Sequence, residues 1–468
     1  MFFLTARQKG RLLMNHQVRR LLAAVLCTWA LLSAPGAKAV EIDPEVQAEF
    51  DRLIEIGAGD ILDQFLSGLP EEVRTALIQA EEAKWASPTV PASAQELDTS
   101  GICGVNVNWE LSGEGKLTIS GTGALFDFRE GRPAPWYESR KEIRELEIGE
   151  GVTVIGNLSF VDCGNLERLT LPQSLEIIGD EAFRGCVSLE EVRLPGSLRG
   201  IGWAAFADCT GLTWIQIPGT VETLGGYAFA GCAGLNTIAI PDSVTAVETG
   251  TFRGCVSLVD VSIPENVSFL GSQAFYGCES LRSVTIPEAV TQIGDSAFSG
   301  CSGLKTANLP VTLETIGPEA FAGCENLSGV SIPGTVRSIG DGAFRDCAAI
   351  TAVMIPSGVT EIGNYAFRNC RALTAVVLPD TLERIGRYAF SYCAKLESLR
   401  IPASVVEIGT EAFSNCGVWS VTFYGDAPRI ADNAFKGVAA SAFYPASAQG
   451  WNRKTAVSYG GTLTWETV

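Results

Sequence analysis

Cysteine is the residue type in this chain with the widest chemical repertoire, and twelve of its fourteen cysteines follow a fixed spacing. They recur every 23 residues from Cys163 to Cys416. Thiols can act as nucleophiles, bind metals or form disulfides. However, a phenylalanine precedes each of these cysteines by three residues, and a proline follows each of the first eleven by nine. A period that includes apolar and turn residues predicts a solenoid of repeated coils.

The stacking of such coils decides what the cysteines can do. Equivalent residues of neighbouring coils have Cα atoms about 4.8 Å apart, which is within disulfide range, but their side chains point the same way and do not converge. The position also faces inward beside Phe and Leu, where a free cysteine packs as a small apolar residue. We therefore expect buried thiols. Disulfides, which secretion would favour, and metal binding are the alternatives.

Other catalytic groups are scarce. The single histidine, His16, lies in a segment that we expect to be removed, so Ser-His-Asp and Cys-His catalysis and His-ligated metals are excluded. The outward acids Glu191 and Asp260 would lie about 14 Å apart, too far for a glycosidase pair. The chain has no glycine-rich phosphate loop and no calcium loop. We expect no enzyme activity, no cofactor and no metal.

Residues 1–39 have the pattern of a secretory signal peptide. Arg19 and Arg20 precede an apolar run at residues 21–32, and Ala37-Lys38-Ala39 fits the small-x-small cleavage pattern. No later apolar run is long enough to span a membrane. The expected location is therefore extracellular or at the cell surface, without membrane insertion after cleavage. A retained membrane anchor is the alternative.

The net charge limits the possible partners. The full chain carries −19, and because residues 1–39 hold six basic residues and no acid, the remainder carries −25. So acidic a surface repels phosphate backbones and anionic headgroups. We therefore do not expect a nucleic acid partner.

The rest of the chain divides by pattern. Residues 40–86 have apolar residues spaced by three and four and predict a small helical segment. We expect it to pack on the array or on itself; the alternative is a helix that binds a partner or dimerises. Residues 87–98 have the composition of a linker. Residues 99–150 lack the repeat and predict an N-terminal β cap, residues 151–435 hold about 12 repeats, and residues 436–468 predict a C-terminal cap.

Within one coil, Val192 and Leu194 alternate with Glu191 and Arg193, which predicts a short strand with two residues facing out. Gly202 then permits a bend. The apolar spacing around Cys209 predicts a helical or 3₁₀ turn. Helix N-cap residue types follow the bend glycine in several coils, as at Asn157, Asp180, Asp341 and Asn364. We therefore expect an α/β solenoid with a parallel sheet and short helical turns.

Residues 281–287 and 290–301 resemble the repeat of the BspA-like family of bacterial leucine-rich-repeat proteins. That repeat reads Leu-x-x-Ile-x-Ile-Pro, then Val-x-x-Ile-Gly-x-x-Ala-Phe-x-x-Cys. The resemblance covers about residues 103–468 and departs from the pattern at Val247-Glu248 and at Ala307, which fills a valine position. It implies a right-handed leucine-rich-repeat coil with a concave parallel sheet, and a role in adhesion to host proteins or other cells.

The outward strand positions supply the candidate ligand-binding residues. Trp214 is an exposed aromatic, which is a common anchor for proteins and sugar rings, and it has Glu191, Arg193 and Gln216 beside it. A second, apolar patch consists of Ala352, Met354, Ala375 and Val377. The outward side chains of the strands between the two patches are short and mainly carry hydroxyl groups, which is typical of a spacer. Binding at a cap or an edge is the alternative.

These features predict a secreted, acidic recognition protein that binds an extracellular or host-surface protein. One alternative is a structural cell-envelope protein without a dedicated ligand, to which anchoring through residues 40–86 would point. The other is a carbohydrate-binding or carbohydrate-degrading protein, which binding to glycans would distinguish. The pattern does not predict an oligomeric state.

Overall fold

The computed structural model describes residues 69, 73–74 and 99–468. The chain divides into two compact units, Met1–Gln95 and Glu96–Val468. The predicted signal peptide, helical segment and linker lie outside the described residues, apart from residues 69, 73 and 74, and they stay predictions. Within the described part of the chain, no helix is long and apolar enough to cross a membrane.

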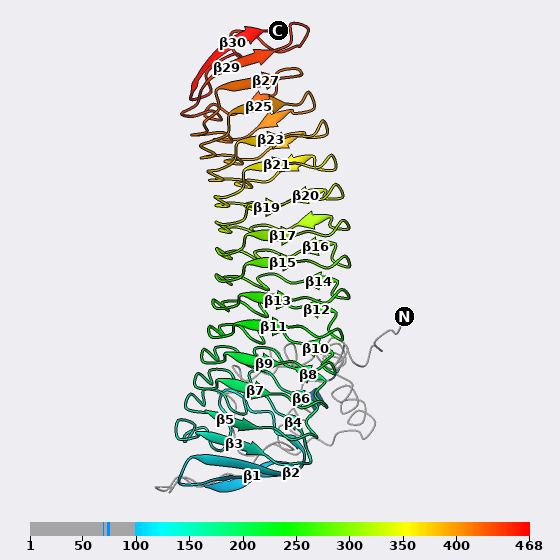
Figure 1. Cartoon of the computed structure of the whole chain (residues 1–468), viewed down its shortest axis with the longest axis vertical. Coiled ribbons are helices and arrows are strands. Elements are labelled where there is room, and N and C mark those ends of the chain that lie inside the picture. The colour runs from blue at the N-terminus through cyan, green and yellow to red at the C-terminus, as the bar shows by residue number, and fades with distance from the viewer. Residues whose placement is uncertain (1–68, 70–72, 75–98) are drawn as a thin grey trace. The chain divides into compact units, whose positions relative to one another are not determined.

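Residues 99–468 form a parallel β-solenoid in which each coil contributes two short strands (Figure 1). Equivalent strands of successive coils stack in register and build two ladders along the axis, as where Glu191 lies beside Trp214. The first ladder holds β3 (Glu145–Ile148), β5 (Arg168–Thr170), β7 (Glu191–Arg193), β9 (Trp214–Gln216), β11 (Thr237–Ala239), β13 (Asp260–Ser262), β15 (Ser283–Thr285), β17 (Thr306–Asn308), β19 (Gly329–Val330), β21 (Ala352–Met354), β23 (Ala375–Val377), β25 (Ser398–Ile401) and β27 (Ser420–Phe423).

The second ladder was not predicted, because Gly202 and its equivalents favour a bend in this part of the coil. Its strands are mostly two residues long, too short to show an alternation. It holds β4 (Val152–Ile155), β6 (Ile177–Ile178), β8 (Gly200–Ile201), β10 (Thr223–Leu224), β12 (Ala246–Val247), β14 (Phe269–Leu270), β16 (Gln292–Ile293), β18 (Thr315–Ile316), β20 (Ser338–Ile339), β22 (Glu361–Ile362), β24 (Arg384–Ile385), β26 (Glu407–Ile408) and β28 (Arg429–Ile430).

The predicted helical or 3₁₀ turns are wrong, since residues 99–468 contain neither type of helix. The backbone between the second ladder and the cysteine has two left-handed residues per coil, such as Glu181 (φ 54°) and Gly185 (φ 75°). Right-handed helices need negative φ throughout. The N–H groups instead bond to the next coil, as where Phe183 donates to the carbonyl of Ala205 at 2.8 Å. The described solenoid is therefore a β structure, not an α/β one.

The residues predicted as helix N-caps join neighbouring coils instead. The side chain Oδ1 of Asn157 accepts a hydrogen bond from the N–H of Asp180 at 2.6 Å, and Oδ1 of Asp180 accepts one from the N–H of Trp203 at 2.8 Å. Oδ1 of Asp341 likewise accepts a hydrogen bond from the N–H of Asn364 at 2.7 Å. The chemistry of a cap is retained, because a short side chain satisfies a free N–H, but the partner lies 23 residues away.

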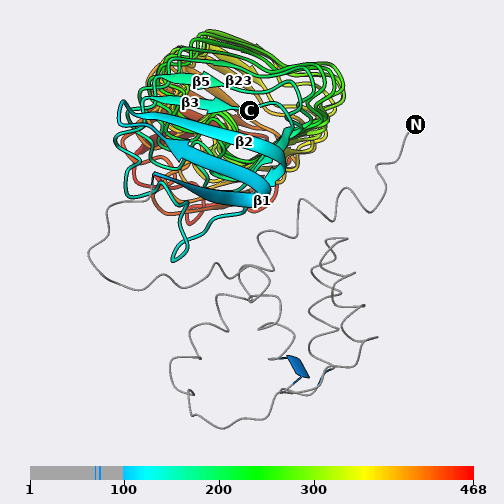
Figure 2. The ribbon, with the colours of Figure 1, turned by 90° about the horizontal axis from the view of Figure 1, so that it is seen from below.

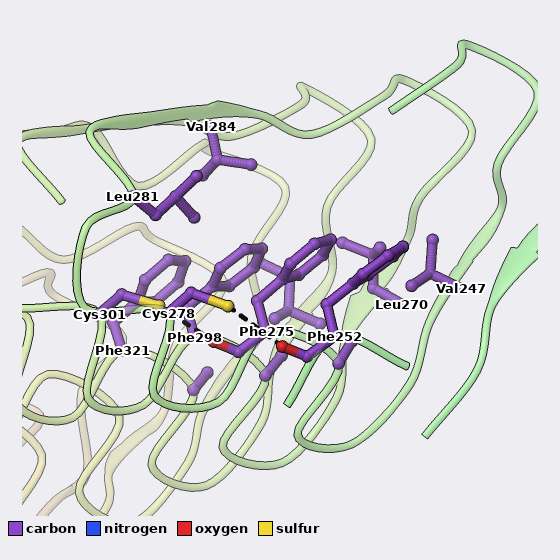
Figure 3. Packing of buried hydrophobic residues seen from close by; sticks show 14 of the residues in the cluster. Val247, Phe252, Leu270, Phe275, Cys278, Leu281, Val284, Phe298, Cys301 and Phe321 are labelled. Atoms are coloured by element: carbon purple, nitrogen blue, oxygen red, sulfur yellow. Dashed lines mark hydrogen bonds between the residues drawn. The ribbon is translucent and has the colours of Figure 1, made fainter. Parts of the chain in front are cut away.

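A column of phenylalanine rings fills the centre of the solenoid. The rings from Phe160 to Phe435 are buried, and each stacks on the next at centroid distances between 5.2 and 5.7 Å. Figure 3 shows four of them, Phe252, Phe275, Phe298 and Phe321, in one row. The predicted inward positions of Phe, Cys and Leu are therefore confirmed, and the column ties every coil to its two neighbours.

Each end of the column is covered by aromatic residues. At the N-terminal end, β1 (Ser100–Leu111) and β2 (Lys116–Leu125) pair antiparallel and lie across the first coils (Figure 2). Trp136 is buried there, stacks on Phe160 and donates its Nε1–H to the carbonyl of Ser159 at 2.8 Å.

At the C-terminal end, β29 (Ala439–Tyr444) and β30 (Thr462–Thr467) extend the first ladder. The ring of Trp465, which belongs to β30, lies 5.0 Å from that of Trp451 between centroids, and both rings contact Phe423. Because both rings are half-buried, they shield the last coil from solvent.

Candidate binding surface

All eight predicted ligand-binding residues are exposed and lie on the outward side of the first ladder, called the strand face here. The cause is the two-residue period of a strand. In β9, Ile215 points into the core while Trp214 and Gln216 point to solvent. The same order recurs in β7 and β21. The alternation in the sequence therefore identified which residues of these strands face solvent.

The ladder brings the four residues around Trp214 together. Parallel pairing of β7 with β9 sets Glu191 beside Trp214 and Arg193 beside Gln216. The Trp214 side chain is 40% exposed, so one part of the ring rests on the sheet and the rest is open. Arg193 and Glu191 lie 4.0 Å apart at their charged atoms, and both are too exposed for this pair to stabilise the fold much. The charges are therefore available to a partner. We call these four residues the Trp214 patch.

The four apolar residues also form one surface. Pairing of β21 with β23 sets Ala352 beside Ala375 and Met354 beside Val377. Met354 is 69% exposed and Val377 55% exposed, although neither carries a polar group. The small Ala352 and Ala375 leave the neighbouring sheet backbone accessible. We call these four residues the Met354 patch.

The strand face does not join the two patches into one site. They are separated by six coils, which corresponds to about 29 Å at the ladder spacing. Both face the same way, so a large partner can contact them together. A small molecule can contact only one.

A shallow groove between the patches was not predicted. It is lined by Ala307, Asn308, Val311, Gly329 and Ser331, among others. The surface is low there because Gly329 has no side chain and the inward Ala307 replaces a larger valine. The departure at Ala307 was the signal for this irregularity in the sequence.

The cysteines contribute no reactive site. All thirteen cysteines of the described chain are buried and free of disulfides. The thiol of Cys278 donates to the carbonyl of Phe252 at 3.2 Å, and Cys301 repeats this contact with Phe275 (Figure 3). Burial raises the pKa of Cys209 and Cys255 to about 12, so the nucleophilic thiolate is disfavoured at neutral pH. The described residues contain no group of three His, Cys, Asp or Glu side chains that could hold a metal ion.

Comparisons with known proteins agree with this fold. The family model for the BspA type leucine rich repeat region matches residues 136–258, 247–374 and 360–441. No curated protein matches the chain. A leucine-rich repeat protein from Bacteroides ovatus is 25% identical with a TM-score of 0.62, and the match covers 77% of this chain and 98% of that one.

Two further solved structures are similar at lower scores. A leucine-rich repeat protein from Eubacterium ventriosum is 24% identical with a TM-score of 0.43, over 68% of this chain and 94% of that one. A leucine rich cell surface protein from Faecalibacterium prausnitzii is 22% identical with a TM-score of 0.41, over 82% of this chain and 96% of that one. Scores this low carry no argument about function. The repeats matched across residues 136–441, with the ladders and ring column that they build, show that the chain belongs to the BspA-type leucine-rich repeat family.

Proposed function

We propose that this protein is a non-catalytic recognition protein, secreted or held at the cell surface, that binds another protein through its strand face. The observation that carries the proposal is the pairing of exposed residues in the first ladder. It gathers the Trp214 patch on two adjacent strands and the Met354 patch on two others. The extracellular location rests on the signal-peptide pattern of residues 1–39.

The chemistry of the two patches suits a protein partner. Trp and Arg are enriched among the residues that dominate protein interfaces, and they act best where a partner covers them from water. Met354 and Val377 offer apolar area that becomes favourable once it is buried. Specific protein interfaces bury about 800 Å² on each partner. A partner of that size can contact both patches across the roughly 29 Å between them, while a small ligand cannot.

The proposal is tested by capturing extracellular and host-surface proteins on the full chain and measuring affinities of variants. Trp214→Ala and Met354→Arg should each weaken binding of the captured protein at least tenfold without lowering Tm, since both side chains face solvent. Trp203→Ala and Val406→Arg are matched controls, because Trp203 is 41% exposed and Val406 58% exposed outside the two patches. Unchanged affinity in both patch variants would contradict the proposal and move the site to a cap or to residues 40–86.

A further inference from the structure

Tyr392 occupies a backbone position that the other coils reserve for residues tolerant of left-handed geometry. The residue before each repeat cysteine has positive φ in all twelve coils. In eleven of them it is Gly, Asp or Asn: Asp162, Gly185, Asp208, Gly231, Gly254, Gly277, Gly300, Gly323, Asp346, Asn369 and Asn415. In the twelfth it is Tyr392, with a φ of 61°.

The positive φ of Tyr392 is unfavourable for a tyrosine, and the fold gains no evident stability from it. Left-handed backbone brings Cβ too close to the neighbouring carbonyl, and Asn and Asp offset this with local hydrogen bonds that tyrosine cannot make. Tyr392 is also 45% exposed, so burial of its ring does not compensate fully. Strained residues that persist on a surface are often held there for binding.

Arg368 contacts the rings of Tyr392 and Tyr365, and a third tyrosine, Tyr388, stacks on Tyr365. The guanidinium carbon of Arg368 is 5.9 Å from the Tyr392 ring centre and 5.8 Å from that of Tyr365. The ring of Tyr365 in turn stacks on Tyr388 in the next coil, with centroids 5.0 Å apart and planes 4° from parallel. Both distances from Arg368 are within cation–π range. Two adjacent turns thus present three phenol rings, of which Tyr365 and Tyr392 contact the Arg368 cation and Tyr388 stacks on Tyr365.

The same turns carry positive charge that no acid neutralises. Residues 362–379 and 384–396 contain no Asp or Glu. Within the described residues, Arg368, Arg371 and Arg387 make no ion pair, although the protein carries −19 overall. We call these three arginines, with Tyr365, Tyr388 and Tyr392, the tyrosine–arginine patch.

The acids on the adjoining turns already have partners. Asp341 accepts hydrogen bonds from Asn364, Asp346 accepts one from Asn369, and Glu411 pairs with Lys436. These three carboxylates of the neighbouring coils are therefore engaged elsewhere. Arg371 donates its Nε–H to Oδ1 of Asn369 at 2.7 Å, but none of the three guanidinium groups has an acidic partner within the described residues. Such groups favour an anionic ligand, especially a carboxylate or a sulfate that can bind two N–H groups at once.

The backbone of these turns offers nothing to a peptide strand. The N–H groups of Tyr365 and Tyr392 donate to the carbonyls of Arg387 and Ser414, each at 2.8 Å, and Asn369 donates to Ser391 in the same way. Strand addition needs free backbone groups at a sheet edge. Recognition here must use side chains alone, which means ring faces, phenol hydroxyls and guanidinium groups.

We propose that the tyrosine–arginine patch binds an anionic saccharide that carries uronate or sulfate groups. Tyrosine rings pack against the apolar faces of sugar rings while their hydroxyls bond to sugar hydroxyls, and the arginines pair with the anionic groups. A short sugar chain laid along the solenoid can contact Tyr365 and Tyr388, which occupy equivalent positions of two successive coils. The acidic surface beyond these turns limits the contact to a short oligosaccharide. This site is separate from the strand face and does not depend on the proposed function.

The ligand class is tested by isothermal titration of the full chain with four probes: a heparin oligosaccharide, a hyaluronan oligosaccharide, dextran and a poly-glutamate peptide. Binding of heparin or hyaluronan, weakened by added NaCl and absent for dextran, supports the proposal. Heparin alone would identify sulfate as the anion, and hyaluronan alone would identify uronate. Binding of poly-glutamate alone, equal binding of dextran, or no saccharide binding would overturn it.

Two sets of variants locate the site. Arg368→Gln, Arg371→Gln and Arg387→Gln combined should abolish saccharide binding. The control combines Arg282→Gln, Arg337→Gln and Arg400→Gln, which removes the same charge from exposed arginines on other parts of the coil and should preserve binding. Equal loss in both sets would mean a general charge effect and overturn the assignment.

Tyr392→Asn gives the sharpest single test. It restores the residue found at this position in the coils on both sides, Asn369 and Asn415, so the fold should be at least as stable by Tm. Saccharide affinity should nevertheless fall at least tenfold. Unchanged affinity in this variant would overturn the role assigned to Tyr392.

Discussion

At the scale of single residues, the phenylalanine column gives the largest predicted effect on stability. Phe298 is fully buried and stacks on Phe275 at 5.2 Å and on Phe321 at 5.3 Å. Phe298→Ala should lower the free energy of unfolding by about 3–5 kcal/mol in urea denaturation. Hydrogen exchange should also quicken in the two adjoining coils, because each coil is stabilised by its neighbours.

The matched control for this variant is Phe269→Ala, since that ring is 48% exposed on the second ladder. Its effect should stay within about 0.5 kcal/mol, as is usual for surface substitutions. A loss below about 1 kcal/mol for Phe298→Ala, under the usual range for a buried ring, would mean that the column is not the main source of stability.

The buried thiols predict a specific response to alkaline pH. Burial raises the pKa of Cys255 from 9.0 to about 12 in the folded chain. Between these values the unfolded chain loses the thiol proton while the folded chain keeps it, so the stability contributed by this thiol falls as pH rises. Cys255→Ala should therefore destabilise the protein most below pH 9. The difference from wild type should shrink by about 1.4 kcal/mol per pH unit above it.

Urea midpoints of wild type and Cys255→Ala between pH 7 and 11 measure this effect. The comparison of the two proteins cancels the titration of other groups. A difference in stability that stays constant across this range would contradict a buried, protonated Cys255.

In the turn before each repeat cysteine, the residue types indicate the backbone conformation better than the spacing of the apolar residues does. The Gly, Asp and Asn residues that precede eleven of the twelve repeat cysteines indicate left-handed backbone. Spacing by three, as between Phe206 and Cys209, was instead interpreted as a helical turn. The inward direction of these side chains could be predicted, because burial depends on the repeat. The turn conformation could not be predicted from apolar spacing, because a stack of left-handed turns has the same period.

At the scale of elements, polar side chains on the turns hold coils together. Asp341 accepts two hydrogen bonds from Asn364 of the next coil, one from the backbone N–H at 2.7 Å and one from Nδ2 at 3.0 Å. Asp341→Ala should lower stability by about 1 kcal/mol. Asp260→Ala, an exposed acid on the strand face, is the control and should change stability by less than about 0.5 kcal/mol. Equal urea midpoints for the two variants would contradict this role of Asp341.

The two ladders differ in how well the sequence predicts them. Alternation around Val192 predicted the first ladder and its exposed residues. The second ladder has no alternation to detect, and Gly202 was assigned to a bend. The structure shows a different reason why glycine is needed at this position. An added Cβ would lie 2.6 Å from the backbone of Gly179 in the preceding coil, which is too close. Contacts between coils are a property of the stack and are not visible within one repeat.

At the scale of the whole molecule, the 23-residue period predicted a solenoid, and the family match confirms it. The surface that binds a ligand is harder to predict from the sequence, because every coil exposes the same positions of its repeat. The sequence indicates a site only where one coil departs from the others, as at Trp214 or Met354. The tyrosine–arginine patch was missed because its residues meet across two turns whose conformation was wrongly predicted.

We propose that one protein partner contacts both patches of the strand face at the same time. The most direct measurement is a titration of the captured partner against wild type, Trp214→Ala, Met354→Arg and the double variant. Sites about 29 Å apart by the ladder spacing should act independently, so their effects on binding free energy should add. We predict that each single change weakens binding at least tenfold and that the double variant shows the product of the two losses. A double variant no weaker than one of the singles would contradict a partner that spans the strand face.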